Sequence, residues 1–291
     1  MHSRQSGLPA GAWPQGGLIG AEGQAVQATI RAMRLAAAAV LGVVTLASLT
    51  ASQAQPAPAA QRPSAAAVPF KVGETLTYDV MWSSSLVAGS AVSTVGSKRA
   101  SAGSTAYAIT VEGRPLPMLS RLYNLFYKMD TLLDSVTLLP HQASLYTEEG
   151  ASRRVAAVRF DRKARRAFYE LQSETVARFD FDVPPQVQDG LSALFVLRAM
   201  TFKAGERITL PIVDRGALYQ LQVEPVSRAR VRVPLGDMDA WTLKTSILDA
   251  DGQAAVDNAA VWISTDARRL PLKLQAELPV GAFVLALRDA R

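Results

Sequence analysis

The sequence predicts an all-β, mainly antiparallel fold: a single strongly curved sheet or an open barrel, with one helix near the concave face. First, apolar and polar residues alternate in short runs from Glu74 onward, as in strands buried on one face. Second, glycine, proline and aspartate punctuate these runs densely, and these residues favour turns. Third, only residues 190–200 carry a helical pattern of ordinary helix length. One helix among many antiparallel strands favours a curved sheet whose open mouth the helix covers.

The N-terminal region resembles a segment that is removed on export. Residues 33–54 start with the basic Arg34, continue with an almost wholly apolar stretch and end with small residues up to Ala54. This order is typical of a secretory signal peptide, and the apolar run is short for a membrane-spanning helix. Because signal peptides begin at the N-terminus, we interpret residues 1–32 as an over-extended start and Met33 as the first residue; the alternative is an unusually long charged leader.

The rest of the chain divides into a linker and one domain. Residues 55–69 are nearly all proline, alanine, glutamine and serine, so we expect an extended linker there. Residues 70–291 are about 220 in number, a normal size for one β barrel or sandwich. We therefore expect a single β domain.

Alternation defines the strands in chain order. Leu76, Tyr78, Val80 and Trp82 fall on one face of the first predicted strand. The same alternation recurs in residues 107–111, 218–223 and 241–243. Turn residues separate the runs at 161–163, 214–216, 234–236, 265–267 and 279–281. This spacing predicts roughly a dozen to fifteen strands.

Two segments depart from the strand pattern. Residues 117–123 fit one helical turn, followed by a strand-like run at 125–133. The longer helix is predicted at residues 190–200, where Asp189 can accept hydrogen bonds from the first free N–H groups. Leu191, Leu194 and Phe195 share one face of this helix, and Arg198 lies one turn further along it.

The composition excludes several kinds of chemistry. The chain has no cysteine, so disulfides, thiolate metal sites, cysteine nucleophiles and a lipoprotein acylation site are absent. After residue 54 the only histidine is His141, which would have to serve as the base of any serine triad, and no Gly-x-Ser-x-Gly motif occurs. We expect a non-enzymatic protein without metal or cofactor; an enzyme that uses only carboxylates and arginines is the less favoured alternative.

Two sets of residues are candidate binding groups. Arg228, Arg230 and Arg232 alternate with apolar residues, so their guanidinium groups share one strand face that could bind phosphate or carboxylate. The alternative is a strand whose charges prevent edge-to-edge pairing. Aromatic residues on the apolar faces, Tyr78, Trp82 and Trp262 foremost, either line a cavity for an apolar ligand or fill the core.

Three sequence motifs carry a resemblance to a known family. They are Phe70-x-x-Gly73-Glu74-x-Leu76-x-Tyr78 with Trp82, Gln188-Asp189-x-Leu191-Ser192 leading to Leu197-Arg198, and Trp262-x-Ser264-x-Asp266-x-Arg268-Arg269-x-Pro271. In this order they resemble the bacterial exported family named domain of unknown function 3108. The resemblance implies a periplasmic half barrel, similar to the lipoprotein carriers of the Gram-negative envelope, and it implies no catalytic residue. Gly190 stands where the family more often has proline.

These observations favour an exported, periplasmic, non-enzymatic protein of a Gram-negative bacterium. The first hypothesis is that it holds an apolar or amphipathic envelope component, such as a lipid or lipoprotein-like ligand, in a concave β surface. The alternative is a structural or scaffolding module that binds an envelope protein or cell-wall polymer through the basic face. The formal net charge of +6 is mild, so we expect no nucleic-acid partner, and we expect no stable membrane anchor in the mature form.

Overall fold

The computed structural model describes residues 68–82, 86–121, 124–278 and 281–291. The predictions for residues 1–32, the signal peptide 33–54 and nearly all of the linker 55–69 lie outside these residues, as does Tyr123. The strands are β1 (Thr75–Trp82), β2 (Leu86–Ser101), β3 (Ser104–Pro115), β4 (Leu125–Asp134), β5 (Pro140–Glu149), β6 (Ser152–Asp161), β7 (Arg166–Gln172), β8 (Val176–Asp182), β9 (Gln188–Asp189), β10 (Ile208–Asp214), β11 (Ala217–Val233), β12 (Gly236–Leu248), β13 (Ala254–Ser264), β14 (Pro271–Leu278) and β15 (Gly281–Ala290). The helices are α2 (Pro117–Ser120) and α3 (Gly190–Ala199).

All described strands belong to one 15-stranded sheet in the order β8-β7-β6-β5-β4-β3-β2-β1-β15-β14-β13-β12-β11-β10-β9. Apart from β8 and β9, which stand at opposite ends of this order, strands that follow each other in the sequence pair with each other, and β1 also pairs with β15. Only β9 and β10 run parallel. The predicted all-β, mainly antiparallel fold with one curved sheet is confirmed.

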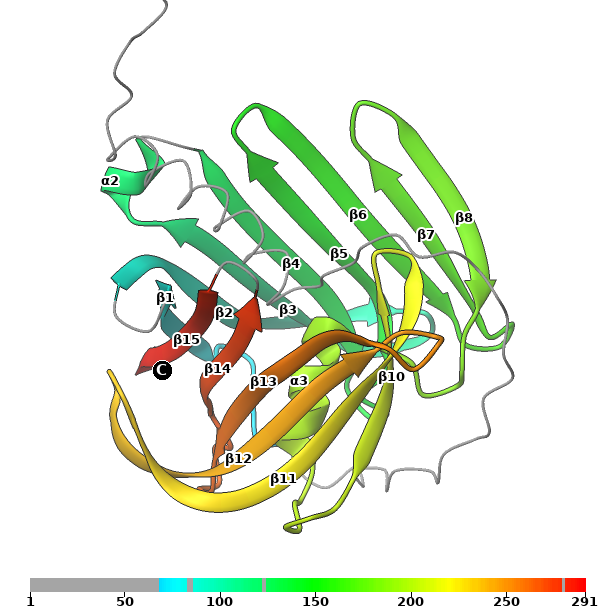
Figure 1. Cartoon of the computed structure of the whole chain (residues 1–291). Helices are drawn as coiled ribbons and strands as arrows, with labels where there is room; N and C mark the ends of the chain where they lie inside the picture. Colours follow the sequence, from blue (N-terminus) through cyan, green and yellow to red (C-terminus); the bar gives the residue numbers. More distant parts are fainter. Residues whose placement is uncertain (1–67, 83–85, 122–123, 279–280) are drawn as a thin grey trace, which may run out of the picture.

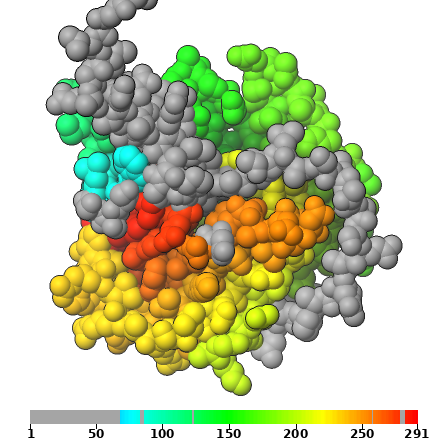
Figure 2. Space-filling view, viewed as in Figure 1, coloured from blue at the N-terminus to red at the C-terminus, as the bar shows by residue number. Residues whose placement is uncertain are grey.

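The sheet curls strongly but does not close. Register shifts interrupt the pairing of β2 with β3, of β11 with β12 and of β12 with β13, and such bulges bend strands and increase twist. As a result β10 to β13 lie opposite β3 and β4 across the helix (Figure 1). In the space-filling view, β11 to β15 form a continuous outer wall, coloured yellow to red (Figure 2).

The two ends of the sheet touch without pairing. A Cβ atom added at Gly216, in the turn between β10 and β11, would overlap the ring of Phe179 on β8 and lie 3.0 Å from Tyr169 on β7. Val213 shares a buried cluster with Val158 and Tyr169. Side-chain packing therefore brings the ends together where backbone hydrogen bonds do not.

Helix α3 occupies the concave face, as predicted, and it forms the centre of the main core. Leu191, Phe195 and Leu197 pack in one cluster with side chains from β3, β4 and β10 to β13. The helix is buried almost all round, including Ser192 and Arg198, rather than along one stripe as the sequence pattern suggested. A helix that is covered on all sides holds the two halves of the sheet together.

Candidate functional site

A cavity of about 230 Å³ lies between α3 and the inner face of the sheet. Val111 and Met129 contribute one wall, from β3 and β4, and Leu221 and Val261 contribute to the opposite wall. These four side chains are only half-buried, because the helix does not fill the space between the walls. The cavity is smaller than most drug-sized sites but has room for one short apolar chain.

A buried ion pair lies beside the cavity, which Arg198 helps to line. Arg198, at the end of α3, donates from Nη1 to Glu74 Oε1 at 2.6 Å and from Nη2 to Glu74 Oε2 at 2.9 Å. Arg198 is 0% exposed and Glu74, which precedes β1, is 5% exposed. A buried, bidentate pair of this kind fixes orientation, and loss of either partner would leave an uncompensated charge.

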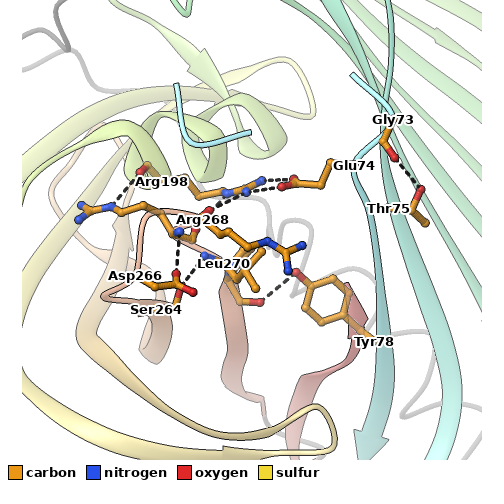
Figure 3. A network of polar contacts seen from close by, with 11 residues as sticks. Gly73, Glu74, Thr75, Tyr78, Arg198, Ser264, Asp266, Arg268 and Leu270 are labelled. Carbon is orange, nitrogen blue, oxygen red and sulfur yellow. Dashed lines mark hydrogen bonds and ion pairs between the residues drawn. The ribbon is translucent and has the colours of Figure 1, made fainter. Parts of the chain in front are cut away.

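The same guanidinium also binds the turn between β13 and β14. Arg198 Nε donates to the carbonyl oxygen of Arg269 at 3.1 Å, and Nη2 donates to that of Arg268 at 3.2 Å. In return, Arg269 Nε donates to the carbonyl oxygen of Arg198 at 3.1 Å, and Arg269 Nη2 donates to the carbonyl oxygen of Met200. Figure 3 shows how Arg198 lies between Glu74 and this turn. The hydrogen bonds satisfy carbonyl groups that the helix end leaves open.

The three motifs of the sequence analysis meet in this network. Glu74 comes from the first, Arg198 from the second and Asp266 from the third. In the third motif, Ser264 Oγ donates to Asp266 Oδ1 at 2.6 Å and accepts from the backbone N–H of Leu270 at 2.7 Å, which shapes the turn (Figure 3). Segments far apart in sequence are thus joined at one point on the helix.

Tyr78 is the one predicted aromatic site residue that lines the cavity. Its hydroxyl donates to the carbonyl oxygen of Pro271 at 2.9 Å, and burial raises its pKa (Figure 3). Trp82 stacks on Phe283 with ring centroids 6.5 Å apart and is not among the described residues that line the cavity. Trp262 likewise does not line it, and Lys273 Nζ lies 4.6 Å from the Trp262 ring.

Asp214, the last residue of β10, also lines the cavity. Its side chain is 23% exposed, and its Oδ2 lies 3.9 Å from Nε of Arg215, beyond hydrogen-bonding distance. Burial raises the pKa of Asp214 to about 6, although the charge of Arg215 and a backbone hydrogen bond from that residue act in the opposite direction. Sequence reasoning treated 214–216 only as a turn, so this carboxyl group was missed.

The start of α3 is fixed by the predicted N-cap. Asp189 Oδ1 accepts from the backbone N–H groups of Leu191 and Ser192 at 2.9 and 3.0 Å, and Ser192 Oγ accepts from the Asp189 N–H at 2.8 Å. Thr131 on β4 donates to the other Asp189 oxygen at 2.9 Å. This capping box joins the helix to β4 at the start, as Arg198 joins its end to β1.

The basic face lies on the distal half of β11, where among the described strands only β12 pairs with it. Strand β10 pairs with residues 217–223 of β11, so the segment that carries the three arginines has one open edge within the described part of the chain. Arg232 donates to Asp237 at 2.7 and 2.8 Å, and the Arg228 guanidinium lies 4.6 Å from the ring centre of Trp241. Arg230 lies opposite Asp239. This arrangement is typical of an edge protected by charge.

His141 lies near a serine and an aspartate, but not in the order of a catalytic triad. Ser104 donates directly to Asp134, while His141 Nε2 lies 3.3 Å from Asp134 Oδ2 and 3.4 Å from Ser104 Oγ. The same ring nitrogen faces both groups, and His141 Nδ1 is buried without a hydrogen-bond partner. A triad needs one nitrogen for each partner. Burial alone would raise the pKa of Asp134, but hydrogen bonds from Ser104, Thr137 and Val136 together lower it to about 2, as expected for a turn cap.

Among the described residues, no three side chains of histidine, cysteine, aspartate or glutamate gather in a way that could hold a metal ion. Within that same part of the chain, every helix is too short or too polar to span a bilayer.

Three solved structures match this chain in a structural comparison, all at low sequence identity. A β-barrel-like protein of domain of unknown function DUF1849 from Brucella abortus matches with a TM-score of 0.48 and 10% identity, over 75% of this chain and 97% of that chain. A protein from Bacteroides fragilis, described as exported with a YmcC-like fold, has a TM-score of 0.33 and 9% identity over 77% and 97%. A protein from Parabacteroides distasonis described as a lipoprotein has a TM-score of 0.30 and 7% identity over 76% and 96%.

No curated protein matches this sequence. A family model described as "Protein of unknown function (DUF3108)" matches residues 77–288, which include the second and third motifs and, from the first, Tyr78 and Trp82. The chain therefore belongs to the DUF3108 family of proteins of unknown function.

Proposed function

We propose that this chain is an exported periplasmic protein that holds the apolar part of an envelope component in the cavity beside α3. The observation that carries this proposal is the cavity itself, whose two walls present half-buried apolar side chains to each other across the concave face. Folding normally removes such side chains from water, so the binding of an apolar ligand that covers them would be favourable. The proposal assigns no catalytic step to the protein.

The size of the cavity limits what it can hold. At ~30 Å³ for each water molecule of liquid, a volume of about 230 Å³ corresponds to roughly eight waters. This suits one short acyl or alkyl chain rather than a whole diacyl lipid. The rest of a larger ligand would extend from the half-exposed side of the cavity.

The test is to extract ligand from protein purified out of the periplasm and to compare two variants by native mass spectrometry. Ala259 lies on the inner face of β13 opposite Thr245, and both residues line the cavity. Ala259→Leu should narrow the cavity and reduce the amount of bound apolar molecule. Ala229→Leu, at an exposed position on β11, adds the same carbons outside the cavity and is the matched control.

Three results decide the proposal. A co-purified apolar molecule that is lost in Ala259→Leu and retained in Ala229→Leu supports it. Protein that is empty after purification, and that takes up no apolar probe in solution, overturns it. Equal loss in both folded variants would place the bound molecule elsewhere and would also contradict it.

A further inference from the structure

Accepting the proposed function, we propose that the cavity selects amphiphiles whose head group donates hydrogen bonds and carries no negative charge. The preferred head is an amine, followed by a hydroxyl group, and a carboxylate is disfavoured. The proposal comes from the two charged residues that line the cavity within the described part of the chain, Arg198 and Asp214.

Arg198 has little capacity left for an anionic head group, because hydrogen bonds within the protein occupy four of its five N–H groups. Its two terminal nitrogens donate to Glu74 at 2.6 and 2.9 Å, and its Nε and Nη2 also donate to the carbonyl oxygens of Arg269 and Arg268. To bind an anion, Arg198 would have to give up the Glu74 carboxylate, which would then be buried without a counter-ion. The positive charge of Arg198 is therefore already paired within the protein.

Asp214 is bound far less tightly than Arg198. Arg215 Nε lies 3.9 Å from Oδ2 of Asp214, and the backbone of Arg215 also donates a hydrogen bond to this carboxylate. A carboxylate offers about four acceptor positions and donates nothing when ionised. The remaining acceptor capacity of Asp214 therefore suits a donor on a ligand, and an ammonium group also supplies the opposite charge.

The surroundings of Asp214 reinforce this preference. Tyr219 lines the same cavity, and Ile212, two residues before Asp214 on β10, contributes apolar surface. Burial first, and then the negative charge of Asp214, raise the pKa of Tyr219 and of Tyr169 on β7. Both phenol groups thus lie within the field of Asp214, and a second negative charge brought there by a ligand would be repelled.

The experiment measures head-group selectivity with chains of equal length. A neutral fluorescent probe, N-phenyl-1-naphthylamine, is bound to the protein at pH 7.5 and displaced by dodecylamine, dodecanol or dodecanoate below their micelle concentrations. We expect dodecylamine to bind about tenfold more tightly than dodecanoate, which corresponds to ~1.4 kcal/mol. Asp214→Asn should reduce this ratio to about two, since it removes the charge and keeps the shape.

Asp182→Asn is the matched control. Asp182 lies on β8, is 87% exposed and does not line the cavity, so its removal changes the net charge equally and should leave the ratio unchanged. If all three ligands bind wild-type protein equally, or the carboxylate binds most tightly, head-group selection is overturned while the cavity function stands. If neither the probe nor any ligand binds, both proposals fail. A ratio that falls equally in Asp214→Asn and Asp182→Asn would reflect net charge alone and would also overturn the selection.

Discussion

The Arg198 guanidinium binds the Glu74 carboxylate across 124 residues of sequence, with both groups buried. Phe70 and Phe195 pack beside this pair, with the Arg198 guanidinium 5.4 and 5.1 Å from their ring centres. The pair connects the end of α3 to the start of β1. The hydrogen bonds from Arg198 to the carbonyl oxygens of Arg268 and Arg269 also connect the helix end to the turn before β14. The position of the helix, and with it the shape of the cavity, depends on this contact.

The first prediction concerns the two halves of the ion pair. Arg198→Met leaves Glu74 buried without a partner and should lower the free energy of unfolding by about 3–5 kcal/mol. Glu74→Leu should do the same by leaving Arg198 unpaired. The double variant should recover part of this loss, since it removes both charges. Urea unfolding of the three variants would measure the coupling free energy between the two side chains. A loss in the double variant equal to the sum of the two single losses would contradict the coupling.

A surface pair provides the control for that measurement. Arg232 and Asp237 also form a bidentate pair, but the Arg232 side chain is 85% exposed. Arg232→Gln should change the free energy of unfolding by less than ~1 kcal/mol. A loss as large as that of Arg198→Met would mean that the basic face has a structural role that its exposure does not suggest.

The second prediction tests the contact between the two ends of the sheet. Gly216 has a φ of 78°, and a Cβ there would overlap the Phe179 ring. Gly216→Ala should therefore cost ~1–2 kcal/mol of backbone strain plus the displacement of the ring. In a Phe179→Ala background only the strain and the milder contact with Tyr169 should remain, so the cost should be smaller. If the cost of Gly216→Ala is identical in both backgrounds, the ends of the sheet are not in contact in solution.

The third prediction concerns the start of α3. Gly190 is the first helical residue, is exposed and has nothing within 4 Å of the position where a Cβ would lie. Gly190→Ala should raise the free energy of unfolding by about 0.5–1 kcal/mol, because the unfolded chain loses freedom and the folded chain accepts the methyl group. Thermal unfolding would check this, and a lower midpoint would show that glycine is needed at this position.

Features that depend on residues close together in the sequence were predicted, and contacts between residues far apart in the sequence were not. Alternation along the chain predicted the strands, and Asp189 before an apolar run predicted the helix start, because both patterns are local. The partner of Arg198 could not be read from the sequence, since Glu74 is brought to it only by the fold. A signal was present nevertheless: Arg198 continues the apolar face of Leu191 and Phe195, and a charge on such a face calls for a buried counter-ion.

The candidate site also combines residues that the local sequence predicted with residues whose place depends on packing. Tyr78 was predicted from its place on the apolar face of β1, and it does line the cavity. Trp82 and Trp262 satisfied the same pattern, but periodicity does not say which apolar residues remain uncovered after packing. Asp214 lies in an ordinary turn sequence, and its burial could not be predicted from that sequence because it depends on how β10 packs against β7 and β8.

The last prediction is a pH dependence that arises from Asp214. Its folded pKa of about 6 lies above the ordinary value near 3.8, so the folded state binds its proton more tightly than the unfolded state does. This contributes stability that is fully present below about pH 4 and is lost as the pH rises through 6. Asp214→Asn has no carboxyl group at this position and does not lose this stability. From pH 4 to pH 7.5 its free energy of unfolding should therefore rise by about 2–3 kcal/mol relative to that of wild type. Asp134, whose pKa is lowered to about 2, acts in the opposite direction and only below about pH 4. Urea unfolding of both proteins across this range would separate the two groups, and parallel curves from pH 4 to pH 7.5 would show that Asp214 titrates normally.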